Sequence, residues 1–525
     1  MATPVIGTDC YNFVHAARCF SNGQYLEAMR HGFHPLFPAL IALVHSVLGD
    51  YEIAGKVISL FFGAITIFPL YFFTRGLFGH RVGVFAAGFL ALNPTHVRLS
   101  ADIMSDPVHI FLFTTAVWLT WVAIERGAWY LYGLVGAVVC LDYLTRTEGM
   151  GLLPIILIWF IITNFRWSKT DILQKILRIG VFTIAFVVTA SPYLIFIKKD
   201  TGHWHYTNHR AVRIIEGKQE AKRPSTEETR SSKGISKEER TPEAVLLARW
   251  KETGQYHRIF IHIINEFAKV FYQPLLLFLF IGLFRVTRPR FEIISLSSIV
   301  RSLLSCLASL RLRLESFDYR KELFVISIFC IYLIPLYLIA YKSYFISGRY
   351  LLPLVVLSFI WAGLGFERLS ACIIGSVGWL ARPFLYSSRG MLIIVSIVLA
   401  VTLPKTVKIK RKYEVSQKEA GYWIKEHHAG SPVIMGEEKV AFYAESEQIL
   451  MALENYEVLL FHAREGKADY LVFYKEELLQ ENPELFRRIE EAEDLQFIKE
   501  WVDQHKKEKE HLRLYRFVPE TKRED

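Results

Sequence analysis

Residues 53–78 read IAGKVISLFFGAITIFPLYFFTRGLF, and Lys56 and Arg75 are their only charged residues. A stretch of roughly 20 apolar residues is long enough to cross the hydrocarbon core of a bilayer. Similar stretches recur along the chain, which predicts an α-helical polytopic membrane protein with about ten spans. The expected spans are 53–78, 81–94, 107–124, 129–145, 149–164, 178–197, 268–286, 322–341, 350–366 and 390–404.

The composition of the 525-residue chain supports this class. Hydrophobic residues make up 52% of the chain and charged residues 21%, with a formal net charge of +10. These values exclude a disordered chain, a collagen-like chain and a disulfide scaffold. Positive charge that gathers in loops between apolar stretches orients a protein in a bilayer, so it does not indicate a nucleic-acid partner. The chain has no phosphate-binding G-x-x-x-x-G-K-[ST] motif, which argues against an ATP-driven pump.

The basic loops predict which parts of the chain face the cytoplasm. Arg75 and Arg81 flank one turn, and residues 166–178 and 285–321 form two longer basic stretches, which should be cytoplasmic. Alternating helices then place the first loop (1–52) and a long loop (198–267) on the outer face. Because Met1 is followed by polar loop sequence without a signal segment, we expect a further transmembrane helix upstream.

Three regions follow from this topology. The first loop, 1–52, carries a candidate catalytic Asp and juxtamembrane helices, and residues 53–404 form the transmembrane domain. Residues 405–525 mix charged helical patterns with short apolar stretches at 432–435, 470–474 and 512–517, which predicts a small α/β domain. The span count places this domain outside the cytoplasm, whereas the basic cluster at 405–412 favours the cytoplasmic side.

Two acidic residues on the expected outer face are candidate catalytic groups. Asp9 lies near Tyr11 in a loop rich in aromatic residues and histidine, where a carboxylate can act as a general base. A helix cap or a plain surface carboxylate is the alternative. Asp106 precedes Pro107, a pair typical of a helix start, in which the carboxylate caps free N–H groups. Two carboxylates on one face can also divide the roles of base and substrate orientation.

Two basic motifs at the ends of spans suit an anionic lipid. Arg146 and Glu148 interrupt two apolar stretches, and Arg349 and Tyr350 open another one. A guanidinium matches the geometry of a phosphate group, although snorkelling anchors and interfacial aromatic residues explain the same patterns. Three histidines in the long loop lack Cys or acidic partners at a recognised spacing, so we predict neither a metal site nor a cofactor.

The order of these motifs resembles the membrane glycosyltransferases of the GT-C fold. It is most similar to the bacterial relatives of protein O-mannosyltransferases and of the aminoarabinose transferases that act on lipid A. The tail is similar to the small extracytoplasmic α/β domain of such proteins. The motifs are Asp9-x-Tyr11, Gly23-x-Tyr25, His34-Pro35-Leu36, Asp106-Pro107, Arg146-x-Glu148 and Arg349-Tyr350-Leu351-Leu352-Pro353, followed in the tail by Gly421-Tyr422-Trp423-Ile424, Tyr443-Ala444 and Ala468-Asp469-Tyr470-Leu471-Val472.

The resemblance implies an inverting sugar transfer from a polyprenyl-phosphate donor to a protein, lipid A or other glycan acceptor. The reaction would occur at the outer face of the plasma membrane and need no nucleotide. Asp9 matches the base that activates the acceptor, and Asp106 matches a second acidic residue of the same site. The residues implied to bind the lipid phosphate or the sugar are Tyr11, His34, Arg146, Glu148, Arg349 and Tyr350.

The sequence departs from the family pattern at two positions. His34 stands where a Lys-Pro pair is common, and Cys10 follows Asp9 where the family often has Asp-Glu. The identity of the sugar and of the acceptor does not follow from these residues. A transporter or flippase of polyprenyl-linked lipids is the alternative, which internal repeats and charges inside the spans would favour. A scaffolding membrane protein is a third reading.

Overall fold

The structure is a computed structural model that divides into two compact units. The membrane unit comprises Ala16–Val407, and the C-terminal unit comprises Met1–His15 together with Lys408–Asp525. The predicted span 390–404 and basic loop 285–321 lie almost wholly outside the described residues, as does most of the loop 198–267. The described residues are 5–7, 9–30, 33–163, 169–207, 256–283, 285–286, 310–311, 319–343, 347–376, 400, 402–406, 414–505 and 508–518.

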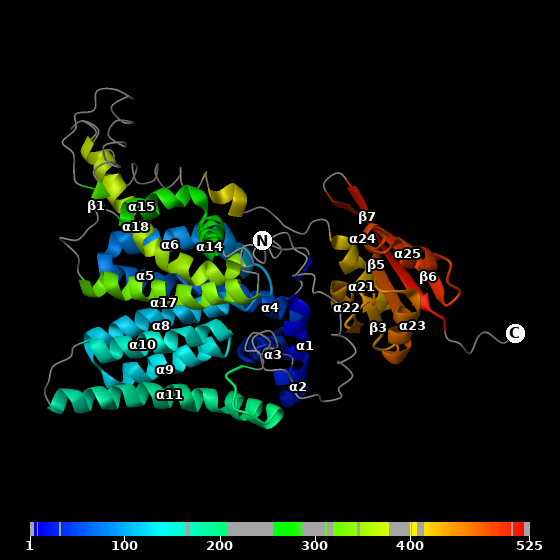
Figure 1. Ribbon diagram of the computed structural model, residues 1–525, viewed down its shortest axis with the longest axis horizontal. Coiled ribbons are helices and arrows are strands. Elements are labelled where there is room, and N and C mark those ends of the chain that lie inside the picture. The colour runs from blue at the N-terminus through cyan, green and yellow to red at the C-terminus, as the bar shows by residue number, and fades with distance from the viewer. Residues whose placement is uncertain are drawn as a thin grey trace. The chain divides into compact units, whose positions relative to one another are not determined.

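The membrane unit is almost entirely helical, and its long helices run side by side (Figure 1). Helix α8 packs against α4, α5 and α9; α9 packs against α11, and α18 packs against α6 and α15. The helices are α1 (Cys10–Ser21, which crosses the unit boundary), α2 (Tyr25–Arg30), α3 (Leu36–Leu48), α4 (Tyr51–Ile65), α5 (Ile67–Phe78), α6 (His80–Leu92), α7 (Pro94–Ser100), α8 (Asp106–Arg126), α9 (Trp129–Tyr143), η1 (Thr147–Gly151), α10 (Leu152–Ile162), α11 (Lys169–Thr201), α14 (Tyr256–Phe271), η3 (Gln273–Leu275), α15 (Leu276–Leu283), α17 (Tyr319–Ser343), η4 (Gly348–Leu351) and α18 (Leu352–Ser376). A two-residue pairing joins β1 (Arg285–Val286) to β2 (Leu310–Arg311).

Five helices among the described residues are long and apolar enough to cross a membrane, and a sixth span is formed if one bent pair is counted. The five are Tyr51–Phe78, Asp106–Arg126, Ile172–Thr201, Lys321–Tyr341 and Gly348–Ser370. The expected count of about ten is therefore not confirmed. The predicted spans 81–94, 129–145 and 149–164 correspond to apolar helices of 10–17 residues, shorter than the roughly 20 residues that cross the hydrocarbon core upright.

The predicted span 268–286 is not one straight helix. Helix α14 ends at Phe271, and the chain bends by 92° before η3 and α15 continue. Tyr272 at the bend has a φ of 76°, a conformation that is costly for a bulky residue. The Nδ2 of Asn93 donates to the carbonyl oxygen of Val270 at 2.9 Å, which satisfies a polar group that the break releases from the helix.

The C-terminal unit contains a five-stranded mixed sheet, which confirms the predicted small domain with a sheet. The strand order is β4-β3-β5-β7-β6; β3 pairs in parallel with β4 and β5, and β7 pairs antiparallel with β5 and β6. The strands are β3 (Val433–Gly436), β4 (Glu447–Ile449), β5 (Tyr470–Tyr474), β6 (Leu495–His505) and β7 (Glu508–Phe517), and the helices are α21 (Val415–His427), α22 (Glu438–Tyr443), α23 (Tyr456–Glu465), α24 (Lys475–Glu481) and α25 (Pro483–Glu490).

Alternate side chains of the central strands build a separate core on each face of the sheet. Tyr470 and Val472 of β5 pack with α21 and α22, whereas Leu471 and Phe473 pack with the other three helices. The described part of the N-terminal segment belongs to the first of these cores. The N–H of Ile6 donates to the hydroxyl of Tyr443 at 3.1 Å, and Tyr11 packs against the same core. The stretch 1–52 thus contributes residues to both units.

Candidate functional site

Arg146 is the centre of a buried charge cluster in the membrane unit. Its guanidinium lies 3.2 Å from Oδ1 of Asp106 and 2.9 Å from Oε1 of Glu148, and its side chain is 13% exposed. It also donates to the hydroxyl of Ser105 at 3.4 Å. Arg146 therefore does not snorkel toward the membrane surface. We call Asp106, Arg146 and Glu148 the Arg146 cluster.

The local sequence explains how these three side chains meet. Asp106 is the first residue of α8 and Pro107 follows it, so the carboxylate stands at the helix N-terminus, where a negative charge is favourable. At the other side, α9 ends at Tyr143, and the N–H of Arg146 donates to the carbonyl oxygen of Asp142 at 3.0 Å. The following turn η1 carries Glu148. Arg146 thereby joins the start of α8 to the end of α9.

Arg349 and Tyr350 lie beside the Arg146 cluster. The guanidinium carbon of Arg146 lies 5.4 Å from the centre of the Tyr350 ring, and that of Arg349 lies 5.8 Å from the same ring. Two cations thus contact one aromatic ring, an arrangement that favours their positive charge. Arg349 and Tyr350 belong to η4, the turn that precedes α18.

His34 also lies against this region. Its Nε2 is 2.8 Å from the hydroxyl of Thr147, the residue between Arg146 and Glu148. The His34 ring packs edge-on against Tyr143, with 5.4 Å between ring centres. The structure therefore brings together six of the eight residues singled out in the sequence, from segments far apart in the chain: His34, Asp106, Arg146, Glu148, Arg349 and Tyr350.

Three further polar residues of this region were missed in the sequence analysis. The Nδ1 of His109 lies 2.6 Å from Oδ1 of Asp142, and both side chains are at least 96% buried. The hydroxyl of Tyr332 is buried and within electrostatic range of the same carboxylates. The sequence held a signal for the first two, because ionisable residues inside apolar segments indicate functional sites.

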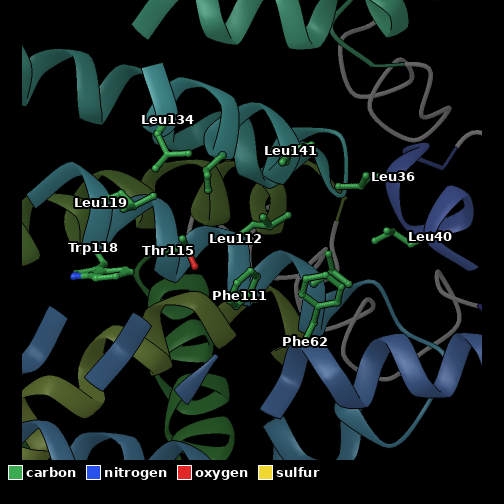
Figure 2. Close-up of a pocket in the computed structure, with 12 residues that line it drawn as sticks. Leu36, Leu40, Phe62, Phe111, Leu112, Thr115, Trp118, Leu119, Leu134 and Leu141 are labelled. Carbon is green, nitrogen blue, oxygen red and sulfur yellow. The ribbon is translucent and has the colours of Figure 1, made fainter. Parts of the chain in front are cut away.

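An apolar pocket lies near the end of α9, which precedes Arg146. It has a volume of about 550 Å³, and aliphatic and aromatic side chains of α3, α4, α8 and α9 dominate its lining (Figure 2). Leu36 and Leu141 lie on one side of the pocket, and Trp118 lies toward the other (Figure 2). The N–H of Leu36 donates to the carbonyl oxygen of Leu144 at 3.0 Å, which ties the pocket to the turn that carries Arg146.

Asp9 and Tyr11, the other two predicted residues, belong to the C-terminal unit. Asp9 precedes α1, and its carboxylate is close enough to Glu438 of α22 for the two side chains to repel each other electrostatically. Burial raises the pKa of the Glu438 carboxyl to about 7, and the charge of Asp9 adds to this shift while Lys439 opposes it. Oε1 of Glu438 is buried without a hydrogen-bond partner among the described residues. Glu438 was not singled out in the sequence.

The described residues contain no group of three or more His, Cys, Asp or Glu side chains that could hold a metal ion. His203 and His205 lie in the described part of the long loop, whereas His209 lies outside it. The Arg146 cluster and its neighbours offer fixed charges: a buried guanidinium, carboxylates and a second arginine at one aromatic ring.

Residues 31–196 match the model of the dolichyl-phosphate-mannose-protein mannosyltransferase family. This segment is less than half of the chain, and it contains His34, Asp106, Arg146 and Glu148. No curated protein is similar enough in sequence to count as a match.

Solved structures are similar over nearly the whole chain. The apo structure of ArnT from Cupriavidus metallidurans has a TM-score of 0.55 at 12% identity, over 97% of this chain and 94% of that one. The structure of the same protein bound to undecaprenyl phosphate has a TM-score of 0.54 with the same identity and coverage. An oligosaccharyltransferase from Archaeoglobus fulgidus has a TM-score of 0.48 at 11% identity, over 89% of this chain and 64% of that one.

The likeness to ArnT shows that this chain has the GT-C fold. The resemblance to GT-C membrane glycosyltransferases that the motif order indicated is thereby confirmed. At 12% identity the likeness concerns the fold, since one fold supports many functions. The function must be argued from the site.

Proposed function

We propose that the protein transfers a sugar from a polyprenyl-phosphate-linked donor to an acceptor at the outer face of the plasma membrane. The observation that carries this proposal is the buried Arg146 cluster, in a segment that matches a mannosyltransferase family and beside an apolar pocket. A phosphate headgroup needs cations, and a polyprenyl tail needs apolar surface. Both lie close together in the membrane unit.

The donor phosphate would bind at Arg146 and Arg349. Both guanidinium groups contact the ring of Tyr350, so a phosphate beside this ring would meet two positive charges. The apolar pocket would hold the first part of the lipid tail, because its lining residues on α8 run from Val108 to Leu119, away from Asp106 at the start of that helix. One of the similar ArnT structures is bound to undecaprenyl phosphate, which supports this class of donor.

The reaction would be a single displacement at the anomeric carbon. The acceptor hydroxyl or amine attacks this carbon, its bond to the phosphate oxygen breaks, and the acceptor proton passes to a carboxylate base. The two arginines would stabilise the negative charge that develops on the leaving phosphate. Asp9 is the proposed base, a role that rests on the resemblance of the first loop. Asp106 and Glu148 would orient the sugar by accepting hydrogen bonds.

The proposal includes the sidedness of the protein. The basic turns at Arg75 and Arg81 and at 166–178 favour the cytoplasm, so the first loop and the C-terminal unit would lie outside it. Reporter fusions after residues 240 and 310 should then fall on opposite sides of the membrane. Two reporters on the same side would contradict this topology.

The test is a transfer assay with the full chain in lipid. Purified protein is incubated with radiolabelled polyprenyl-phosphate sugars and a membrane extract, and movement of label to a new acceptor is measured. Asp9→Asn removes the base with little change in shape, so transfer should fall by about 10²- to 10⁴-fold. Asp200→Asn is the matched control, because Asp200 forms a surface ion pair with Arg30 and such pairs contribute little.

Each outcome bears on a separate part of the proposal. Transfer of label that depends on Asp9 would identify the sugar from the active donor and would support the transferase reaction. Full activity of Asp9→Asn would end the role of Asp9 as base and leave the transferase in place. Folded protein that transfers no sugar from any donor, yet moves polyprenyl-linked lipid across the bilayer, would replace the transferase by a flippase.

A further inference from the structure

His109 and Asp142 form an ionisable pair that the proposed function does not yet use. The pair joins α8 to α9 through a 2.6 Å contact, and the two side chains are 4% and 0% exposed. Groups of this kind are costly inside an apolar helix bundle, because burial removes them from water. A buried pair of this kind therefore needs a reason in function or in specificity of the fold.

The pair stands one helical turn from the Arg146 cluster. Asp106 and His109 are three residues apart on α8, a spacing that puts both side chains on the same side of that helix. Asp142 is on the last turn of α9, and Arg146 follows that helix in extended backbone, with its N–H bonded to the carbonyl oxygen of Asp142. Two adjacent contacts thus connect the same two segments: Asp106 with Arg146, and His109 with Asp142.

The backbone couples Asp142 to the cluster directly. The carbonyl oxygen of Asp142 accepts hydrogen bonds from the N–H groups of Thr145 and Arg146, each at 3.0 Å. Gly149 packs so closely on this peptide that a Cβ at Gly149 would lie 2.8 Å from the same oxygen. The turn that carries Arg146 and Glu148 is therefore folded onto Asp142, and a shift of Asp142 would move both charges.

In the contacts that join α8 to the end of α9, protonated His109 opposes the charge of Asp142, and Arg146 opposes those of Asp106 and Glu148. Loss of the His109 proton makes these contacts more negative by one charge, which disfavours an anionic ligand in a site of low dielectric constant. The other titratable groups that lie against this region among the described residues include His34, Tyr143, Tyr332 and Tyr350.

We propose that protonated His109 is a positioning residue for the donor site. It holds Asp142, and with it the turn of the Arg146 cluster, and it offsets the carboxylate charge that would repel the donor phosphate. This inference rests on the proposed function, because it assumes that a lipid phosphate binds beside Arg146. His109 acts through Asp142 and through charge, without contact to the reacting atoms.

The test measures binding of an undecaprenyl phosphate methyl ester to the purified full chain between pH 6 and 9. The probe is a diester, so its own charge is constant over this range. His109→Asn retains an N–H donor close to the position of Nδ1 and loses the positive charge. We expect about tenfold weaker binding, because the variant leaves the negative charge of Asp142 uncompensated near the bound phosphate. Wild-type affinity should fall as the pH rises and His109 loses its proton, and the variant should lose this dependence.

The double variant His109→Asn/Asp142→Asn separates charge from structure. It removes one positive and one negative charge, so the balance returns and binding should recover to within about twofold of wild type. A purely structural role predicts that the double variant binds no better than the single one. His96→Asn is the matched control: His96 is also buried, its Nε2 lies 3.0 Å from the carbonyl oxygen of Gly63, and its replacement should leave binding unchanged.

Arg146→Gln distinguishes the failure of this inference from the failure of the proposed function. If Arg146→Gln weakens binding and His109→Asn does not, the donor site stands and the role of His109 is wrong. If neither change affects binding, the donor site itself is wrong. A His109→Asn variant that binds weakly with an unchanged pH profile and without rescue by Asp142→Asn would also overturn the inference. Melting temperatures of the same samples show whether each variant is folded.

Discussion

The two units bury carboxylates in opposite ways. In the membrane unit, Asp106 and Glu148 lie within 3.2 Å and 2.9 Å of the Arg146 guanidinium. In the C-terminal unit, Glu438 faces the like charge of Asp9, and the nearby Lys439 forms its ion pair with Glu414. The pKa of Glu438 is accordingly raised to about 7, chiefly by burial.

This difference shows what a fixed cation does for a buried acid. Carboxylates that share a guanidinium have a cation and its N–H donors beside them, and their remaining lone pairs can accept hydrogen bonds from a substrate. A carboxyl without such a partner gives up its charge near neutral pH and becomes sensitive to small changes in proton concentration. The first arrangement suits the binding of a donor, and the second responds to pH.

The largest expected effect follows from removing the cation of the membrane unit. Arg146→Gln leaves Asp106 and Glu148 buried without their shared partner, which should cost about 3–5 kcal/mol of stability. The measurement is the apparent melting temperature of the full chain in lipid, together with transfer activity. Arg126→Gln is the control, because Arg126 is an exposed residue at the end of α8.

A second substitution checks the cause of that loss. Asp106→Asn in the Arg146→Gln background removes one of the two unpaired charges and should recover part of the lost stability. If Arg146→Gln unfolds at the wild-type temperature, the cluster is not a buried ion network and the contrast between the units fails. Equal loss in the single and double variants would assign the effect to packing of the Arg146 side chain instead of its charge.

A smaller effect is expected from narrowing the apolar pocket. Leu134 lines the pocket and is 46% exposed, so Leu134→Trp can add volume without overpacking a core. Binding of a long-chain polyprenyl phosphate should weaken about tenfold, the loss expected when about two methylene groups leave apolar surface. Binding of a short-chain analogue should not change, because its tail does not reach Leu134.

The control for this change is Leu323→Trp on α17. Leu323 is 51% exposed and does not line the pocket. Equal effects on both chain lengths would show that Leu134→Trp disturbs the phosphate site, and no effect on either would remove the pocket from the donor site. In both cases the charged cluster would have to be considered without the tail contacts proposed here.

The sequence predicted those parts of the fold that depend on local pattern. Long apolar stretches gave the spans at Asp106–Arg126 and Lys321–Tyr341, and short apolar runs gave strands β3, β5 and β7. Strand β6 (Leu495–His505) was missed, because its apolar and charged residues come in pairs around an irregularity at Phe497/Lys499 and do not show the alternation typical of a strand. The bend at Tyr272 was also missed. The residue that satisfies the carbonyl oxygen of Val270 beside the bend is Asn93, which lies far away in the chain.

The candidate site shows the same limit. Side chains that stand next to a helix start or a span end, such as Asp106 and Arg146, could be singled out from sequence. Their mutual contact could not, because it joins segments 40 residues apart in a register that only packing fixes. The association of Ile6 with Tyr443, which brings Asp9 into the C-terminal unit, has no local signal at all.

The smallest expected effect concerns Glu438 of the C-terminal unit. The folded-state pKa of Glu438, about 7, is above its ordinary value of 4.5, so the protonated form is favoured in the folded protein. The stability contributed by this proton is complete below the unfolded pKa and is lost as the pH rises through about 7. Glu438→Gln mimics the protonated form, so it should be about as stable as wild type near pH 4.5.

At pH 8 the same variant should be more stable than wild type by about 1 kcal/mol, a value reduced for the partial exposure of the group. The measurement is the difference in apparent melting temperature between Glu438→Gln and wild type across pH 5 to 8. Glu445→Gln serves as control, because Glu445 is an exposed partner of Lys425. A constant difference across this range would mean that Glu438 stays ionised in the fold, and both units would then compensate their buried carboxylates in the same way.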